Sequence, residues 1–208
     1  MPGSTSPRHA YTPDSDLQFV EACAPELEAY LRASEVFWPL APAKGFAPLP
    51  RLTLGGLLLA LRRLGAVERG LRAPQAVRLA QARMRLETER LRRTAAIGAK
   101  MTLETHARLS LWRAYLDDLS ESPASNADLY PTEIRQRAML QLLATAPETG
   151  PLPAEAGQAM RALDARLREM FAAGSFVWEE HLAPAFSPPE YWFLYGRPTK
   201  KGKREVIS

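Results

Sequence analysis

Apolar residues recur at three- and four-residue spacing through most of the chain, the pattern of amphipathic helices packed around a core. Most segments that show it begin at a capping residue or a proline and end near a glycine or a proline. They are 16–33, 53–64, 74–96, 102–119, 131–146, 153–173 and 188–195. No pair of alternating β-branched runs indicates a sheet, and 175–178 is the one strand-like piece. The pattern predicts an all-α fold, an irregular helical bundle of six to eight helices with a long arginine-rich central helix or helical hairpin.

The longest uninterrupted pattern, 74–96, carries two apolar stripes. At 100° per residue, one stripe contains Val77, Ala80, Met84, Thr88, Leu91 and Ala95, and we expect it to face the core. Leu79 and Leu86 lie on the far side, which indicates a helix packed on both sides or used in a second interface. Gly98 is expected to end this helix, so that it forms an antiparallel hairpin with 102–119. A helix that continued through Gly98 would instead form one long rod.

Local signals refine the helix ends. Ser15 and Gln18 form a capping-box pattern at the start of the first helix, and Pro25 predicts a kink or a restart within it. Thr53 is expected to cap the second helix. The pair Gly55–Gly56 lowers helix propensity there, which indicates the close approach of another helix.

Composition is that of a globular protein with polar ends. The 208 residues are 46% hydrophobic and 24% charged, enough for one sizeable core. The order of the chain predicts a flexible N-terminal tail at 1–14, a single helical domain at 15–196 and a basic C-terminal tail at 197–208. The one cysteine excludes an intramolecular disulfide, and no apolar run reaches the ~20 residues of a membrane span. A cytoplasmic location is therefore expected.

Aromatic residues gather near the C-terminus, where eight of the 17 fall between 171 and 195. Such side chains bury large areas, so we expect the segment to close the core as a lid. The alternative is an aromatic pocket or partner anchor formed by Trp178, Tyr191, Trp192 and Tyr195.

Positive charge concentrates in one region of a chain whose formal net charge is +4. Residues 62–93 hold ten arginines against three glutamates. Arg78, Arg85 and Arg92 repeat every seven residues on one face, where their guanidinium groups could bind phosphates. Two glutamates of the same helix can pair with four of its arginines, which leaves Arg78 and Arg92 as the expected free charges. The tail would add non-specific attraction to nucleic acid through Lys200, Lys201, Lys203 and Arg204.

The sequence shows no catalytic constellation, and we predict no cofactor and no metal site. It has three histidines and no HExxH pattern. Asp117, Asp118 and His181 remain as candidates for acid–base chemistry.

Three functional hypotheses follow. The leading one is a non-catalytic helical interaction or accessory protein that binds another macromolecule, either a protein partner or a second copy of itself. The alternative is a nucleic-acid-binding protein that contacts phosphates through the arginine face and the basic tail. An enzyme of unknown reaction is the third, and no small-molecule ligand is predicted.

Overall fold

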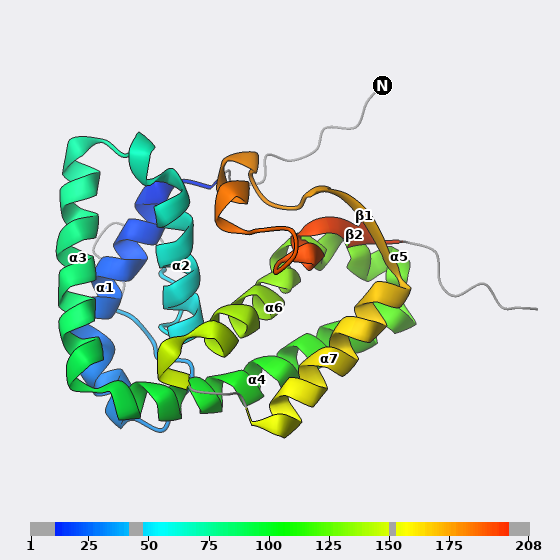
Figure 1. The fold of residues 1–208 in the computed structure, drawn as a ribbon, viewed down its shortest axis with the longest axis horizontal. Coiled ribbons are helices and arrows are strands. Elements are labelled where there is room, and N and C mark those ends of the chain that lie inside the picture. The colour runs from blue at the N-terminus through cyan, green and yellow to red at the C-terminus, as the bar shows by residue number, and fades with distance from the viewer. Residues whose placement is uncertain (1–10, 42–47, 150–152, 200–208) are drawn as a thin grey trace, which may run out of the picture.

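The computed structural model describes residues 11–41, 48–149 and 153–199 (Figure 1). Most of the expected N-terminal tail (1–10) and the basic residues Lys200, Lys201, Lys203 and Arg204 lie outside these ranges. Within them the chain forms seven α-helices, short 3-10 segments and one two-stranded antiparallel hairpin. The predicted all-α class and helix number are confirmed, and the hairpin is an addition that the sequence pattern does not predict.

The helices are α1 (Pro13–Arg32), α2 (Leu54–Val67), α3 (Ala73–Arg92), α4 (Thr94–Glu121), α5 (Pro123–Asn126), α6 (Tyr130–Thr145) and α7 (Ala154–Glu169). The strands are β1 (Phe171–Phe176) and β2 (Tyr195–Pro198). The 3-10 segments are η1 (Glu68–Gly70), η2 (Ala127–Leu129), η3 (Pro147–Thr149), η4 (Glu180–Ala185) and η5 (Trp192–Leu194).

The first three helices form one side of the molecule, with α1 lying between α2 and α3 and packed on both (Figure 1). Leu17, Val20 and Leu27 of α1 are buried there. Together with the inner faces of α2 and α3 and the start of α4, they form the first of two apolar clusters.

The start of α1 differs from the expectation. It begins at Pro13, with Thr12 as the N-cap residue, rather than near Asp16. Proline suits the first helical turn, where its missing N–H group would have no partner. Pro25 lies inside the helix, which runs on to Arg32 without a restart. Burial of α1 against two neighbouring helices compensates for the hydrogen bond that Pro25 removes.

The second apolar cluster joins α4, α6, α7 and the C-terminal segment. The segments 102–119 and 131–146 are amphipathic as expected, and the apolar face of each, to which Met101 just before the first also belongs, is buried. The buried residues of the two faces are Met101, Leu109, Trp112, Tyr115, Leu116, Leu119, Ile134, Ala138, Met139, Leu142 and Leu143. The helix α2 stands between the two clusters, because it packs on α1 and also on α6 and η4.

Two local predictions for α2 are confirmed. The hydroxyl oxygen of Thr53 accepts a hydrogen bond from the backbone N–H of Gly56 at 3.0 Å, so Thr53 caps the helix. A Cβ atom on Gly55 would lie 2.7 Å from a carboxylate oxygen of Glu104 and 3.1 Å from the Cβ of Met139. Gly55 is therefore a position at which side chains of α4 and α6 lie close against α2.

The junction of α3 and α4 lies at Arg93, not at Gly98, which is inside α4. The expected antiparallel hairpin is wrong, since α4 turns sharply away from the end of α3 and crosses towards α6 and α7 (Figure 1). Gly98 has another role, because a Cβ there would lie 2.6 Å from the backbone oxygen of Glu148. The absence of a side chain at Gly98 lets η3 pack directly on α4.

The core face predicted for α3 is also wrong. Leu79, Ala82 and Leu86 are buried against the first cluster, whereas Val77, Met84 and Leu91 of the expected core stripe are exposed. Periodicity identifies both stripes, but it does not tell which one meets α1.

The C-terminal segment folds back on itself. β1 pairs with β2 in antiparallel register, with Phe171 opposite Pro198 and Ala173 opposite Gly196. The helix predicted for 188–195 is instead a turn followed by η5, and Gly174 lies in β1 rather than at the end of α7. Gly196 has a φ angle of 145°, and a Cβ there would lie 2.2 Å from the backbone oxygen of Ala172. The hairpin therefore requires glycine at this position.

Candidate interaction surface on helix α3

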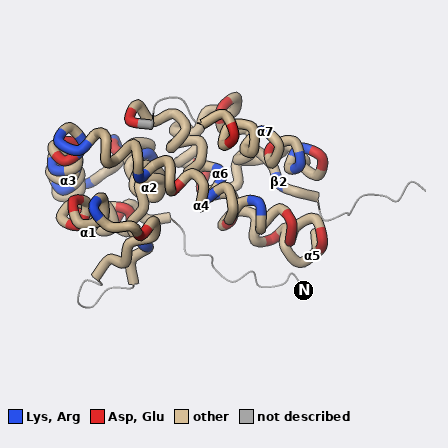
Figure 2. The backbone as a smooth tube through the Cα atoms, turned by 90° about the horizontal axis from the view of Figure 1, so that it is seen from below, with Lys and Arg blue, Asp and Glu red and all other residues tan. Residues whose placement is uncertain are grey.

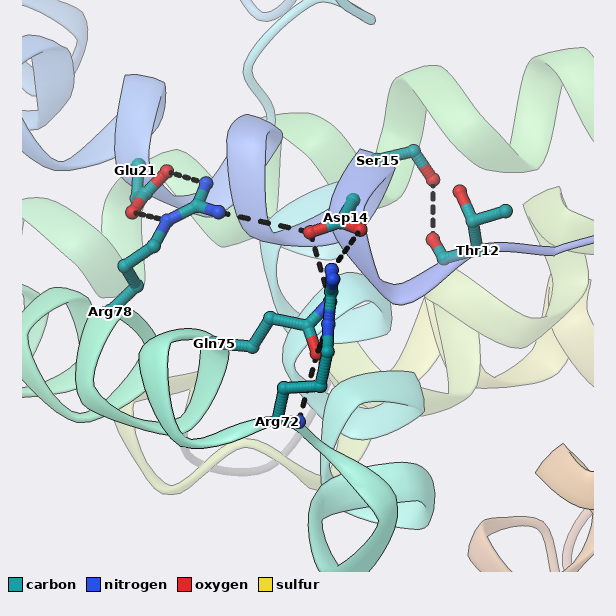
Figure 3. Close-up of polar contacts among 7 residues, drawn as sticks. All are labelled: Thr12, Asp14, Ser15, Glu21, Arg72, Gln75 and Arg78. Carbon is teal, nitrogen blue, oxygen red and sulfur yellow. Dashed lines mark hydrogen bonds and ion pairs between the residues drawn. The ribbon is translucent and has the colours of Figure 1, made fainter.

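The arginine-rich helix is attached to α1 by a bidentate ion pair. Nε and Nη2 of Arg78 donate to the two carboxylate oxygens of Glu21 at 2.7 and 2.6 Å (Figure 3). Asp14 lies 3.7 Å from Nη1 of the same guanidinium group. The hydrogen bond to Glu21 raises the pKa of Arg78. The expectation that Arg78 carries free charge is therefore wrong.

The N-terminus of α3 is held to the same part of α1. The side-chain oxygen of Gln75 accepts from the backbone N–H of Arg72 at 2.9 Å, and its amide nitrogen donates to Asp14 at 3.0 Å (Figure 3). Arg72 also reaches Asp14 at 3.4 Å. Next to it, Ser15 donates to the backbone oxygen of Thr12 at 2.8 Å. Asp14 thus joins the starts of both helices.

Two further arginines of α3 and Arg93 at its C-terminal cap have close carboxylate partners. Arg83 pairs with Glu68, Arg90 with Glu87 and Glu148, and Arg93 with Glu28 and Glu89. The hydrogen bond from Arg90 lowers the pKa of Glu87, and that from Arg93 lowers the pKa of Glu89. The mainly basic helix α3 lies against the mainly acidic helix α1 (Figure 2). The positive charge of these arginines is largely neutralised by the carboxylates beside them.

Arg85 and Arg92 are the exceptions on this face. Arg85 is exposed and makes no ion pair or hydrogen bond to any residue that the structure describes. Arg92 reaches Glu89 only at 3.4 Å, and its side chain is 68% exposed. The face of Arg78, Arg85 and Arg92 therefore divides into one arginine fixed to α1 and two directed to solvent. Sequence spacing pairs Arg85 with Glu89 and so does not predict Arg85 as a free charge. In the structure, Glu89 is bound by Arg92 and Arg93 instead.

The outer side of α3 presents apolar surface beside these two arginines. Val77 is 55% exposed, and Met84 and Leu91 are each 66% exposed. They repeat every seven residues, each directly before one of the residues Arg78, Arg85 and Arg92 in the sequence. The outer stripe, defined here as Val77, Met84 and Leu91, thus forms a ridge with cationic groups along one edge.

The four aromatic candidates make packing contacts in the C-terminal segment, where the rings of Trp178, Tyr191 and Tyr195 each lie against Phe176 or Phe186. Tyr191 is buried beneath the Arg62 guanidinium, 4.8 Å from the ring centroid, and Trp192 stacks with Arg168 at 3.7 Å. The hydroxyl of Tyr195 donates to the backbone oxygen of Phe186 at 2.6 Å. Trp178 also lines a cleft that faces α1 and α6. The joint aromatic pocket stays a prediction.

The acid–base candidates lie in different elements. Asp117 and Asp118 are exposed near the end of α4, where Asp117 pairs with Arg166 of α7 at 2.7 Å. His181 is in η4, which packs on α2, and its ring lies 5.7 Å from that of Tyr11. Among the described residues, no group of three or more His, Cys, Asp or Glu side chains could hold a metal ion. None of the described helices is long and apolar enough to cross a membrane.

Comparisons with protein families, with curated proteins and with solved structures found no match. A function for the protein therefore has to be inferred from the chemistry of its own surfaces.

Proposed function

We propose that the protein is a non-catalytic helical accessory protein whose outer stripe on α3 binds an amphipathic helix of another protein. The observation that carries the proposal is the exposure of Val77, Met84 and Leu91 at seven-residue spacing. This is the spacing at which one helix packs lengthwise on another. The partner helix would carry an apolar seam with acidic residues along the edge that meets Arg85 and Arg92.

The energetics favour covering the stripe. Full burial of a large aliphatic side chain contributes roughly 1.5–3 kcal/mol. Because the three side chains are already partly covered, roughly 1 kcal/mol each remains to be gained on docking. The buried side of α3 is fixed to α1 by apolar packing and by the Arg78–Glu21 pair. The outer stripe is therefore displayed on a rigid support, which limits the entropy lost on binding.

A second copy of the chain fits this surface less well. In an antiparallel pair of α3 helices, the edge with Arg85 and Arg92 would face the same edge of the other copy. In a parallel pair it would face the edge with Glu87, which Arg90 already binds at 2.6 Å. Charge complementarity thus favours an acidic partner of different sequence.

Nucleic acid is the weaker alternative. A phosphate-binding face needs several unpaired cations, and most arginines of α3 are paired with carboxylates. Arg85 and the loosely paired Arg92 remain, together with tail lysines outside the described residues. This alternative is one outcome of the experiment below.

Crosslinking at Met84 tests the proposal. A photoreactive phenylalanine analogue in place of Met84 is expected to capture one protein in cells of the native source. The crosslinked peptide should be an amphipathic helix with acidic flanks. Capture of the same chain, capture of nucleic acid, or no capture at all would overturn the proposal.

Charge insertion provides the quantitative test. We expect Met84→Glu and Leu91→Glu to weaken binding of the captured partner at least about tenfold, because each places a carboxylate in the apolar seam. Leu103→Glu is the matched control, since Leu103 is 52% exposed but lies on α4. Equal loss in all three variants would show that the stripe is not the binding surface.

A further inference from the structure

A cleft of about 730 Å³ opens between the start of α1, residues 48–51, the inner side of α2, α6 and residues 178–182. Its lining combines apolar side chains such as Phe37, Met139 and Trp178 with four arginines and two carboxylates. The volume lies in the range of sites for small organic molecules, and an apolar lining with a few polar groups is typical of them. The outer stripe on α3 contributes no residue to it.

Two of the four arginines are fixed within the protein. Arg63 makes a bidentate ion pair with Asp16, with distances of 2.9 and 2.6 Å. Arg108 donates to the buried carboxylate of Glu104 at 2.5 Å and to Thr53 at 2.7 Å. These two arginines shape the wall of the cleft, and their charges are compensated.

Arg135 is different, because it makes no hydrogen bond or ion pair to any described residue. Its side chain is exposed where it lines the cleft. Desolvation by the neighbouring groups lowers the pKa of its guanidinium, and the charge of Arg63 lowers it further. Asp16 and Glu179 oppose this effect. Asp16, however, is bound by Arg63, and Glu179 accepts the backbone N–H of Tyr11 at 2.7 Å. Arg135 is thus an exposed cation at the edge of the cleft, without a carboxylate of the described residues in ion-pair contact.

A second polar group of the cleft also lacks a partner. The hydroxyl of Tyr11 is buried and has no hydrogen-bond partner among the described residues. Burial raises the pKa of this hydroxyl, and the nearby carboxylate of Asp16 raises it further, so the hydroxyl is a protonated polar group of the cleft wall. Arg51, also in the lining, donates only to the backbone oxygen of Phe37, at 3.3 Å.

Apolar groups flank Arg135 along α6. Pro131, Arg135 and Met139 are spaced four residues apart and therefore lie on one face of the helix. Trp178 is attached to the start of this face, since its indole N–H donates to the backbone oxygen of Pro131 at 2.9 Å. A molecule whose acidic group meets Arg135 would therefore find Trp178 on one side and Met139 on the other.

We propose that this cleft binds a small organic acid, a molecule with one carboxylate, sulfonate or phosphate group on a flat apolar body. The acidic group pairs with Arg135, and the apolar body lies against Trp178 and Met139. The sequence pattern predicts no small-molecule ligand, because the cleft combines residues from several distant segments. The inference does not depend on the partner proposed for α3.

Binding of 8-anilinonaphthalene-1-sulfonate to the full chain tests the inference, because this fluorescent probe is an aromatic anion. We expect saturable binding with one site per chain. Replacing Arg135 by Gln should weaken it by roughly tenfold or more, as for loss of a charge-assisted contact. Arg135→Lys, which keeps the charge, should weaken it less.

The neutral analogue N-phenyl-1-naphthylamine separates charge from apolar attraction. It should bind more weakly than the sulfonate and should not respond to Arg135→Gln. Arg69→Gln is the matched control, since Arg69 is an exposed arginine of η1 outside the cleft. Met84→Glu tests whether the probe binds to the outer stripe instead of the cleft. Both control variants, Arg69→Gln and Met84→Glu, should leave the affinity for the sulfonate unchanged. Non-saturable binding, or equal sulfonate affinity in the wild type and a folded Arg135→Gln variant, would overturn the inference.

Discussion

Gly98 lies in α4 where a Cβ atom would come within 2.6 Å of the backbone oxygen of Glu148. Inside a helix, glycine is usually less favourable than alanine by about 1 kcal/mol. Here we expect the opposite order, with Gly98→Ala lowering the free energy of unfolding by roughly 1–3 kcal/mol, because the backbone of η3 would have to move. Urea denaturation followed by circular dichroism measures this difference.

Gly157 of α7 is the matched control. A Cβ there would meet only the end of the Arg161 side chain, at 3.5 Å. Gly157→Ala should therefore raise stability by about 0.5–1 kcal/mol through the ordinary helix preference. If both substitutions stabilised the protein equally, the close approach of η3 to α4 would be excluded.

Cys23 gives stability a pH dependence. It has no exposed surface, and burial raises the pKa of its thiol. In the unfolded chain the thiol ionises near pH 8.5, as model thiols do. The folded-state pKa is the higher one, so its contribution to stability is present below about pH 8.5 and is lost as the pH rises. We expect unfolding free energy to fall by up to about 1.4 kcal/mol per pH unit between about pH 8.5 and 10.

Denaturant unfolding at pH 8, 9 and 10 checks this slope against that of Cys23→Ala. The variant loses packing at every pH, but it has no thiol to ionise, so its curve should be lower and flatter. Parallel curves for the two proteins would show that the thiol does not cause the dependence.

At the scale of the helix, Arg78 and Arg85 should differ although they are seven residues apart on one face. Arg78 is bound by Glu21, but both side chains are more than one-third exposed, so solvent screening limits the pair. We expect Arg78→Met to reduce stability by about 0.5–1 kcal/mol and Arg85→Met to change it little. Thermal unfolding at low and high salt measures both, and the difference should shrink as salt rises. A larger loss for Arg85→Met would contradict the assigned pairs.

The sequence pattern predicts the buried face of some helices better than that of others. The core faces of α4 and α6 could be predicted, because residues such as Trp112 and Ile134 belong to one continuous apolar stripe. α3 has two stripes of similar strength, and only the contact with α1 selects Leu79 and Leu86 for the core. The β1–β2 hairpin could not be predicted, because its pairing is long-range and its first strand contains alanine and glycine rather than β-branched residues.

At the scale of the molecule, the candidate surfaces were predictable to different degrees. The outer stripe on α3 was visible as a set of residues, although the pattern assigned it to the core. The cleft around Arg135 was not visible, because its lining comes from segments separated by more than 150 residues. Helical periodicity places residues on one element and says nothing about which elements enclose a common space.

The two apolar clusters are joined by α2 and α4, so we expect the protein to unfold as one cooperative unit. α2 packs on α1, α6 and η4, and α4 runs from Ile97 in the first cluster to Leu119 in the second. Neither cluster can open without exposing apolar surface on these shared helices, which links their stabilities.

The chain contains a reporter for each cluster. Cys23 is buried in the first, and Trp112, Trp178 and Trp192 belong to or pack against the second. Trp38 packs against the first, so the fluorescence is recorded on a Trp38→Phe variant. Thiol labelling by a disulfide reagent and tryptophan fluorescence should therefore show the same urea midpoint and the same slope. Cys23 should be unreactive below the transition, because the thiol is covered and protonated. Labelling that begins at clearly lower urea than the fluorescence change would show that α1–α3 opens independently, and that α2 does not couple the clusters.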